Sequence, residues 1–217
     1  MTQSFSEPIY FLRRISYTID MTVNKSDLRV QRTRRSIREA MIDLILNNPY
    51  EEITVRNIAK HAGVGFKTFY RHYRDKSDLM RDIQEEFLVK AQAEILPPTN
   101  LSSGEKQTLP ILHFGQKHAD LLRAILRTPI NDQWTERLIQ FGFLYAQQIE
   151  LESHDENPSK DEKIRDLAIH QLIHGTIILL GWWLENDMPF EAEEMAEYMN
   201  HVLVRPVWGL PKVKISD

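Results

Sequence analysis

The feature that most constrains this chain is the spacing of its apolar residues, which recur every three or four positions. Such a period places one apolar face on a helix, whereas a half-buried strand alternates between apolar and polar residues. No pair of alternating segments is joined by a hairpin turn. Three helical stripes are Val30, Thr33, Ile37, Ala40, Met41, Leu44 and Ile45; Leu79, Ile83, Phe87 and Ala91; and Leu138, Phe141, Tyr145 and Ile149. The sequence therefore predicts an all-α fold.

Proline, glycine and small polar residues divide this helical chain in two. The segment Pro97–Pro110 holds three prolines and one glycine, a composition typical of a linker. We expect an N-terminal arm over residues 1–28 that is disordered or partly helical, a small domain over residues 29–76, a connecting helix over residues 77–96 and a larger helical domain over residues 97–217.

Composition excludes several classes of protein. The 217 residues include no cysteine, which excludes disulfide scaffolds, thiolate metal sites and cysteine nucleophiles. The N-terminal arginines follow an apolar patch, the reverse of a secretory signal. The longest apolar run, Leu172–Leu184, is shorter than the ~20 residues of a membrane span, so a cytoplasmic protein without a membrane partner is expected. Met21 starts a second plausible N-terminus, and the sequence leaves open whether residues 1–20 belong to the native protein.

Local signals predict two short helices joined by a tight turn after a longer first helix. Pro49 ends the first helix, because the residue before a proline is pushed out of the helical region. Thr54 is a good N-cap for a helix over Val55–Ala62, and Gly63 supplies the left-handed residue that ends it. A further helix over residues 65–73 follows, and Asp75 caps the next one. This arrangement is a helix-turn-helix unit, whose second helix enters the major groove of DNA.

The helix over residues 65–73 has one apolar and one cationic-aromatic face. Phe69 and Tyr73, four residues apart, are expected to pack inward. The outward side chains are Phe66, Lys67, Tyr70, Arg71 and His72, which suit phosphate and base contacts. The charge distribution agrees, since residues 29–80 carry 11 Lys+Arg and 6 Asp+Glu for a net charge of +5, whereas the whole chain carries −4.

The stretch TVRNIAKHAGVGFKTFYRHYRDKSDL resembles the headpiece of the TetR/AcrR family of bacterial transcriptional regulators. The matching residues are Thr54, Ile58, Ala59, Ala62, Gly63, Val64, Thr68, Phe69, Tyr70, His72, Tyr73, Lys76 and Leu79. Gly65 departs from the Ser or Thr more common in the family, and loses a capping hydroxyl. Phe66 is uncommon at an outward position: it either meets a thymine methyl group or covers the corner between the two helices.

The headpiece and the resemblance together predict a DNA contact set. Its members, drawn from the first three helices and the start of the fourth, are Arg32, Thr33, Arg34, Thr54, Val55, Arg56, Gly65, Phe66, Lys67, Thr68, Tyr70, Arg71, His72 and Lys76. Lys76 is expected at a phosphate beside the N-terminus of the fourth helix.

The resemblance implies that residues 97–217 bind a small-molecule effector and form a homodimer through the last two long helices. Candidate pocket residues, some of which belong to the core instead, are Phe114, His118, Trp134, Phe141, Tyr145, His174 and Trp182. The helix over residues 160–185 is apolar on two faces, so one face can meet a partner. The residues assigned to the dimer interface are Ile169, Ile173, Thr176, Leu180, Trp183, Met195, Met199 and Val202.

The sequence thus predicts a regulator, more specifically a ligand-responsive repressor that binds a palindromic operator as a homodimer. No cofactor or catalytic motif is expected, so the chain is predicted not to be an enzyme. His170 and His174 are four residues apart, but no third ligand is positioned beside them, so no metal site is expected. Two alternatives stay open: an effector-independent DNA-organising protein, and a coactivator that uses this fold to bind a partner.

Overall fold

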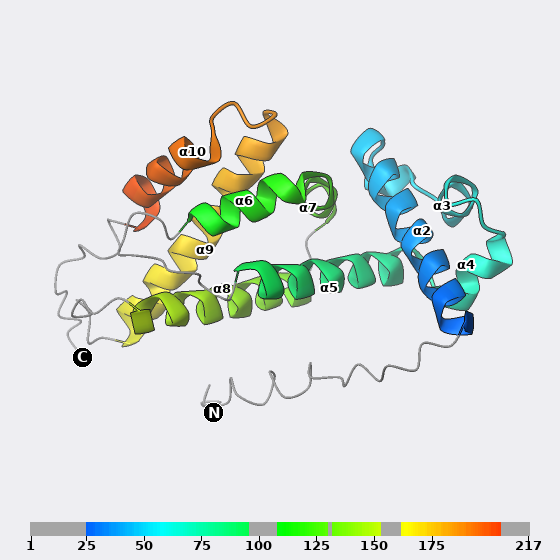
Figure 1. Cartoon of the computed structure of the whole chain (residues 1–217), viewed down its shortest axis with the longest axis horizontal. Helices are drawn as coiled ribbons and strands as arrows, with labels where there is room; N and C mark the ends of the chain where they lie inside the picture. The colour runs from blue at the N-terminus through cyan, green and yellow to red at the C-terminus, as the bar shows by residue number, and fades with distance from the viewer. Residues whose placement is uncertain (1–24, 96–107, 130–131, 153–161, 205–217) are drawn as a thin grey trace.

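The computed structural model describes residues 25–95, 108–129, 132–152 and 162–204. All regular structure within these residues is helical, which confirms the all-α prediction (Figure 1). The elements are α2 (Lys25–Asn47), the 3-10 turn η1 (Tyr50–Glu52), α3 (Val55–His61), α4 (Phe66–His72), α5 (Lys76–Ile95), α6 (Leu109–Lys117), α7 (Ala119–Leu126), α8 (Asp132–Glu152), α9 (Glu162–Glu185), α10 (Ala192–Met199) and the π-helical turn η2 (Asn200–Val204).

Two expected segments lie only partly within the described residues. The first helix begins at Lys25, inside the expected arm, and residues 1–24 of that arm lie outside the described residues. Of the expected linker only its last three residues are described, and α6 begins at Leu109 with Pro110 in its first turn. Proline suits that position because the first turn of a helix leaves its N–H groups without helical partners.

Capping residues set the first and last residues of the headpiece helices. Thr54 forms a capping box with Asn57: its side chain accepts from the Asn57 N–H at 3.2 Å, and its own N–H donates to Asn57 Oδ1 at 3.1 Å. Gly63 has φ +65°, and Val64 N donates to the Ala59 carbonyl at 2.9 Å, as in a Schellman C-cap. Asp75 Oδ1 accepts from the Asp78 N–H at 2.7 Å and starts α5. These three local signals confirm the predicted helix-turn-helix boundaries.

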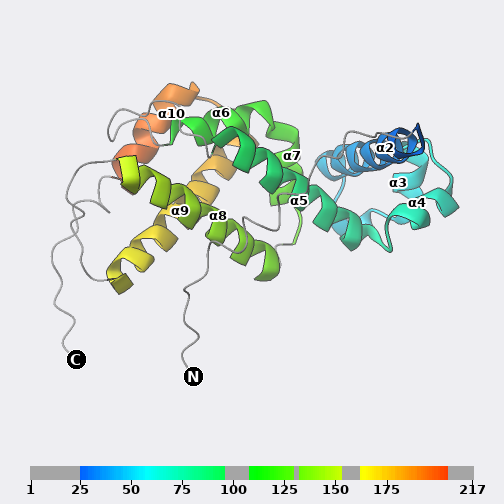
Figure 2. The same ribbon diagram turned by 60° about the horizontal axis from the view of Figure 1, so that its bottom comes forward.

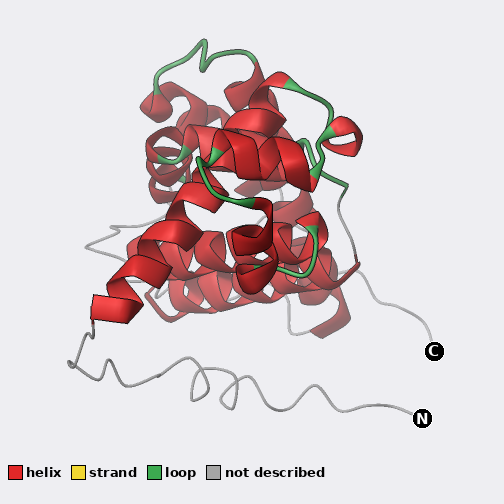
Figure 3. Ribbon diagram, turned by 90° about the vertical axis from the view of Figure 1, so that its right-hand side faces the viewer, coloured by secondary structure: helices red, strands yellow, loops and turns green. Residues whose placement is uncertain are grey.

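The helix α5 connects the two ends of the molecule. Figures 1 and 2 show α2, α3 and α4 at one end and α6 to α10 at the other, with α5 running between them. Figure 3, seen from the headpiece end, shows the helices of the two ends one behind the other. A helix of this length spans about 30 Å, so its two ends contact different layers of the protein.

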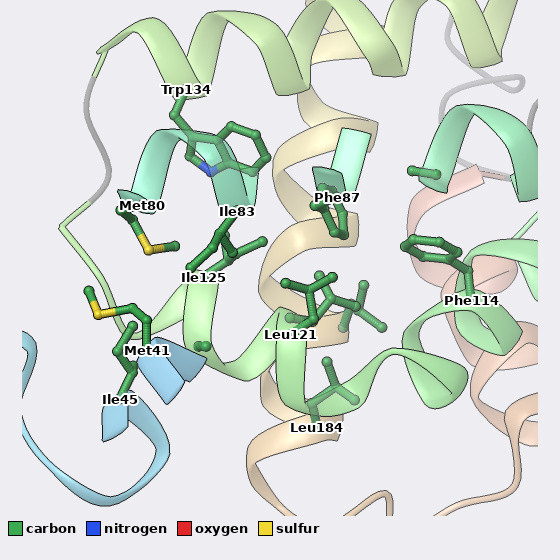
Figure 4. Packing of buried hydrophobic residues seen from close by; sticks show 14 of the residues in the cluster. Met41, Ile45, Met80, Ile83, Phe87, Phe114, Leu121, Ile125, Trp134 and Leu184 are labelled. Carbon is green, nitrogen blue, oxygen red and sulfur yellow. The ribbon is translucent and has the colours of Figure 1, made fainter. Parts of the chain in front are cut away.

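The core is continuous between the two ends. In Figure 4, Met41 and Ile45 of α2 lie near Met80 and Ile83 of α5 and near Ile125 of α7. Phe87 continues this core toward the aromatic residues of α6 and α8. Since α2 also packs along α7, the headpiece is joined to the larger domain by apolar contacts as well as by α5.

The helix α9 contains a long apolar stretch. Its part Leu167–Glu185 has the length and hydropathy of a membrane span, although the shorter apolar run in the sequence predicted none. The same helix packs against α6, α7, α8 and η2 and buries Leu180, Trp183 and Leu184 completely or nearly so. Core packing therefore accounts for one of its two apolar faces.

Candidate nucleic-acid interface

The outward face of α4 carries two aromatic rings among cations. Phe69 and Tyr73 are buried, which confirms the predicted inward face. Phe66 and Tyr70 are each 49% exposed, and Lys67 and Arg71 are exposed beside them. The helix thus presents charge and apolar surface together, as a reader of duplex DNA requires.

The neighbouring helices add further polar groups to this face. Thr54 and Arg56 of α3 and Arg32 of α2 are exposed, whereas Val55 is half-buried. The Thr33 hydroxyl donates to the Arg29 carbonyl at 2.9 Å within α2. Arg32 and Arg56 are thus accessible to a phosphate, and their contact with DNA stays a prediction.

Arg34 differs from them because it belongs to a cluster centred on Asp82 of α5. Its Nη2 donates to Asp82 Oδ1 at 2.6 Å, and Arg38 Nη1 donates to Asp82 Oδ2 at 3.0 Å. The Tyr73 hydroxyl donates to the same Oδ2 at 2.6 Å, and the Arg38 guanidinium also pairs with Glu86 at 2.6 Å. This cluster ties α2, the end of α4 and α5 together. Arg34 therefore holds the headpiece in shape before it meets any phosphate.

Lys76 also forms its hydrogen bonds within the protein. Its Nζ donates to the carbonyls of Tyr50, Ile53 and Glu51 at 2.7, 3.0 and 3.2 Å, and lies 4.4 Å from the centre of the Tyr50 ring. An ammonium has three donors, so all of them are used. The residue predicted to hold a phosphate instead satisfies the carbonyls of the η1 turn.

Two groups near α4 have shifted pKa values. Burial, with the positive charges of Arg34 and Arg71, lowers the pKa of the half-buried His72. Burial and the hydrogen bond to Asp82 raise the pKa of Tyr73 to about 12. His72 is therefore neutral at pH 7 and Tyr73 stays protonated, so that its hydroxyl remains a donor to Asp82.

The predicted effector residues separate into two groups. Phe114 and Trp134 are buried on either side of Phe87, with ring centres 5.5 and 5.8 Å from it, and His118 lies 4.6 Å from Phe114. Tyr145 is buried as well, and Phe141 lines a shallow groove between α5 and α8. His174 and Trp182 instead lie on the exposed face of α9, so they do not join this cluster.

Most residues predicted for the dimer interface are core residues of the single chain. Trp183, Met195 and Met199 are almost completely buried, and so are Ile169 and Leu180. Ile173, Thr176 and Val202 are half-buried. A Cβ at Gly175 would meet Leu203 Cδ2 at 2.5 Å, so this glycine lets η2, not a partner, approach α9. Buried side chains of one chain have no surface to offer a second molecule.

The other face of α9 is a stripe of large exposed side chains, here called the α9 stripe: Leu167, Ile178 and Trp182. Leu167 and Ile178 are each 69% exposed. Phe190 stacks on Trp182 with a centre distance of 6.3 Å, and Tyr198 of α10 is exposed as well. Sequence periodicity revealed both faces of α9 but not which of them the rest of the chain covers.

One residue of the headpiece was not found from the sequence at all. Asp82, the centre of the headpiece cluster, lies 44 and 48 positions from its arginine partners, so no local pattern reveals it. His170 and His174 have stacked rings, and the His170 carbonyl lies 2.8 Å from His174 Nδ1. Among the described residues no group of three or more potential metal ligands gathers.

A capped helix-turn-helix with a cationic, aromatic second helix is the arrangement of a DNA-binding unit, and a larger helical domain lies behind it. The profile described as bacterial regulatory proteins, tetR family, matches residues 37–83, and one described as transcriptional regulator C-terminal region matches residues 103–205. The chain belongs to the TetR family of transcriptional regulators, as its headpiece motif predicted.

Similar proteins agree with this family. A stretch of 107 residues is 27% identical to YxbF of Bacillus subtilis (strain 168), an uncharacterized HTH-type transcriptional regulator, but covers only 26% of that protein. The fold is similar to that of a TetR transcriptional regulator from Streptococcus agalactiae 2603V, with a TM-score of 0.58 and 23% identity over 82% of this chain and 97% of that one. It is also similar to NalD of Pseudomonas aeruginosa, the secondary repressor of the MexAB-OprM multidrug efflux pump, with a TM-score of 0.58 and 21% identity over 81% of this chain and 96% of that one.

Proposed function

We propose that this chain is a cytoplasmic, non-enzymatic repressor that binds a palindromic operator as a homodimer and releases it when a small molecule binds the larger domain. The observation that carries the proposal is the pairing of two outward faces on one chain, the cationic-aromatic face of α4 and the apolar α9 stripe. The first suits DNA, and the second suits a copy of itself.

The α9 stripe supports self-association. Three large apolar side chains are exposed on one helix face, and Phe190 stacks on one of them, Trp182; exposed apolar patches of this kind mark interaction sites. Pairing two copies of one face gives a two-fold axis, and two headpieces related by that axis read two half-sites of a palindrome. The dimer interface is therefore proposed at Leu167, Ile178 and Trp182 rather than at the buried residues that the sequence predicted.

Two connections support a ligand response. The helix α5 makes the first connection. Its residue Phe87 packs between the aromatic rings of Phe114 and Trp134, and its residue Asp82 accepts a hydrogen bond from Tyr73 at the end of α4. Arg127 makes the second connection: it pairs with Glu185 of α9 through Nη2 at 2.7 Å and donates to the Leu46 carbonyl of α2 through Nη1 at 2.8 Å. A ligand that displaces α5 or α7 would therefore move the headpiece.

We propose that the effector enters beside the aromatic cluster, from the groove between α5 and α8. Phe141, Leu88 and Leu144 give this groove apolar walls, and Arg137, which pairs with Glu85, gives it a polar rim. To act as a switch, the ligand must bind the conformation that does not fit DNA more tightly, with a coupling of about 1–3 kcal/mol.

A footprint on the DNA that flanks its own gene tests the function. Purified protein at moderate salt should protect a discrete palindromic site, and the Lys67→Ala/Tyr70→Ala double variant should not. The Lys90→Ala variant, changed outside the headpiece, should protect the same site as the wild type. The absence of a discrete footprint would remove the proposal, and continuous coverage of all DNA would favour the DNA-organising alternative. Normal regulation by the double variant would favour the coactivator alternative.

A further inference from the structure

Phe66 and Tyr70 form an aromatic pair on the outer side of α4. They lie one helical turn apart, their ring centres are 4.9 Å apart, and the planes meet at 77° in an edge-to-face contact. The Tyr70 ring in turn contacts buried Phe69, with ring centres 5.5 Å apart. The pair is thus supported from its own helix, while about half of each side chain remains open to solvent.

The interior beneath α4 is filled by residues other than the pair. Phe69 is completely buried there and Tyr73 is 3% exposed, whereas Phe66 and Tyr70 are each 49% exposed. Two aromatic side chains that contact each other and are both half open form an apolar patch, which is more informative than a single exposed hydrophobic residue. The exposed sides of Phe66 and Tyr70 are therefore available to a partner.

Gly65 leaves the approach to Phe66 open. Its backbone, with φ −68° and ψ 145°, suits any residue, so no turn requires glycine here. A Cβ at this position would meet only Thr68 Oγ1, at the ordinary distance of 3.6 Å. The protein has room for a side chain and lacks one, and a capping Ser or Thr would even stabilise α4. The missing side chain clears the surface next to Phe66 for a partner.

The neighbours of the pair identify that partner. Lys67 and Arg71 are exposed on the same helix, and Arg56 is exposed on α3. The cations suit an anionic partner, and the exposed ring of Phe66 suits an apolar group on that partner. The major groove of duplex DNA combines phosphates with one apolar group at the base edges, the C5-methyl group of thymine. We infer that Phe66 packs against a thymine methyl group in each half-site and that Tyr70 holds its ring in place. This inference rests on the proposed operator binding and names the base that one side chain reads.

Replacing thymine by deoxyuridine removes the methyl group and nothing else. After selection of bound duplexes from random DNA, each thymine of the half-site is replaced in turn, and the Kd is measured for the wild type and for Phe66→Ala. The replacement of one particular thymine by deoxyuridine should weaken wild-type binding about fourfold per half-site. This is the effect expected when one methyl-sized group is removed from an apolar contact. Phe66→Ala should bind the thymine and deoxyuridine duplexes equally at that position.

Control variants separate reading of the base from folding. Phe66→Leu should keep part of the discrimination, because leucine still contacts a methyl group. Val89→Ala, changed at an exposed apolar residue of α5, should keep all of it. Melting temperatures of the variants should match the wild type, since Phe66 is half-exposed.

Two results would overturn the inference: a wild type that binds its selected site but tolerates deoxyuridine everywhere, or Phe66→Ala that still discriminates. Failure to select any DNA would instead remove the proposed function.

Discussion

The outward face of α4 and the α9 stripe both expose large apolar side chains, but they sit in regions of opposite charge. Residues 29–80 carry a net charge of +5, and residues 81–217 carry 13 Lys+Arg against 22 Asp+Glu. The basic region attracts a polyanion, which leaves an exposed aromatic ring there to contact bases. The acidic region has the opposite sign, so its exposed apolar side chains suit the protein partner that we propose rather than DNA. Charge, not apolarity, distinguishes the two faces.

The two faces also differ in what holds them in position. The helix that carries the α9 stripe is held by apolar packing, because Leu180, Trp183 and Leu184 on its opposite face are buried. The face of α4 is held by the buried side chain of Phe69 and by the polar cluster around Asp82, which connects α4 to α5. A polar connection depends on geometry more steeply than apolar packing does. The DNA-reading face is therefore the one that a small displacement of α5 can move.

The largest expected effect comes from breaking the α9 stripe with Ile178→Asp. A carboxylate in the centre of an apolar interface would be buried without a partner, so the dimer should dissociate. Operator affinity should fall at least about 100-fold, because two linked half-site contacts become independent. Sedimentation measures the mass, and a gel shift measures the affinity.

The matched control is Gln116→Asp, which places the same charge on an exposed residue of α6, outside the groove between α5 and α8. It should stay dimeric and bind the operator normally. Circular dichroism checks the fold of both variants, which should persist since Ile178 is mostly exposed. A dimeric Ile178→Asp protein would show that the stripe is not the interface.

The next effect tests the support of α4 with Asp82→Asn. Removal of this charge leaves Arg34 and Arg38 without their shared partner, and stability should fall by about 2 kcal/mol in urea unfolding. Glu39→Gln breaks the exposed pair with Arg35 instead and should leave stability nearly unchanged, because solvent screens that pair. Equal losses would mean that the cluster is no more than a surface contact.

Tyr73 reports on the same cluster. Its pKa of about 12 lies above the usual value of 10.0, so its contribution to stability is intact below pH 10 and is lost as the pH rises toward 12. An absorbance titration of the tyrosines should show one that ionises late in the wild type. In Asp82→Asn it should ionise earlier, because the negative charge that opposes ionisation is gone.

Local signals explain why the headpiece could be predicted so closely. Thr54, Gly63 and Asp75 each set a helix end through bonds to residues three to five positions away, so the sequence contains the whole interaction. The buried pair Phe69 and Tyr73 follows from helical spacing in the same way.

Contacts between distant segments could not be predicted. The apolar faces of α9 are alike in composition, and only packing against α6, α7 and η2 decides that Trp183 lies inside and Trp182 outside. The same limit applies to Lys76 and Arg34, which look like DNA contacts in sequence. Their partners, the Tyr50 carbonyl and Asp82, lie 26 and 48 positions away.

A comparison of Lys76→Met with Lys67→Met separates a structural cation from a DNA-binding one. Lys76→Met leaves three carbonyls without their donor and should cost about 1–2 kcal/mol in stability. It should not change the salt dependence of binding. Lys67→Met should leave stability unchanged and reduce the slope of log K against log salt by about 0.9 for each phosphate that the lysine no longer neutralises. Interchanged results would return Lys76 to the residues that hold phosphates.

The smallest expected effect concerns His72, which lies at the border between the DNA-reading face and its support. In the free protein burial and the charges of Arg34 and Arg71 lower its pKa, so the ring is neutral at pH 7. A phosphate beside the ring would favour the protonated form and raise its pKa in the complex. Binding then takes up a proton, and affinity should rise by about threefold as the pH falls from about 7 to about 6. Glutamine at position 72 cannot be protonated, so the His72→Gln variant should lose this increase in affinity. Substitution of a histidine outside the headpiece should leave the increase unchanged. Gel shifts at the two pH values measure the change. Equal pH dependence in both proteins would assign His72 to the support of α4 rather than to its DNA-reading face.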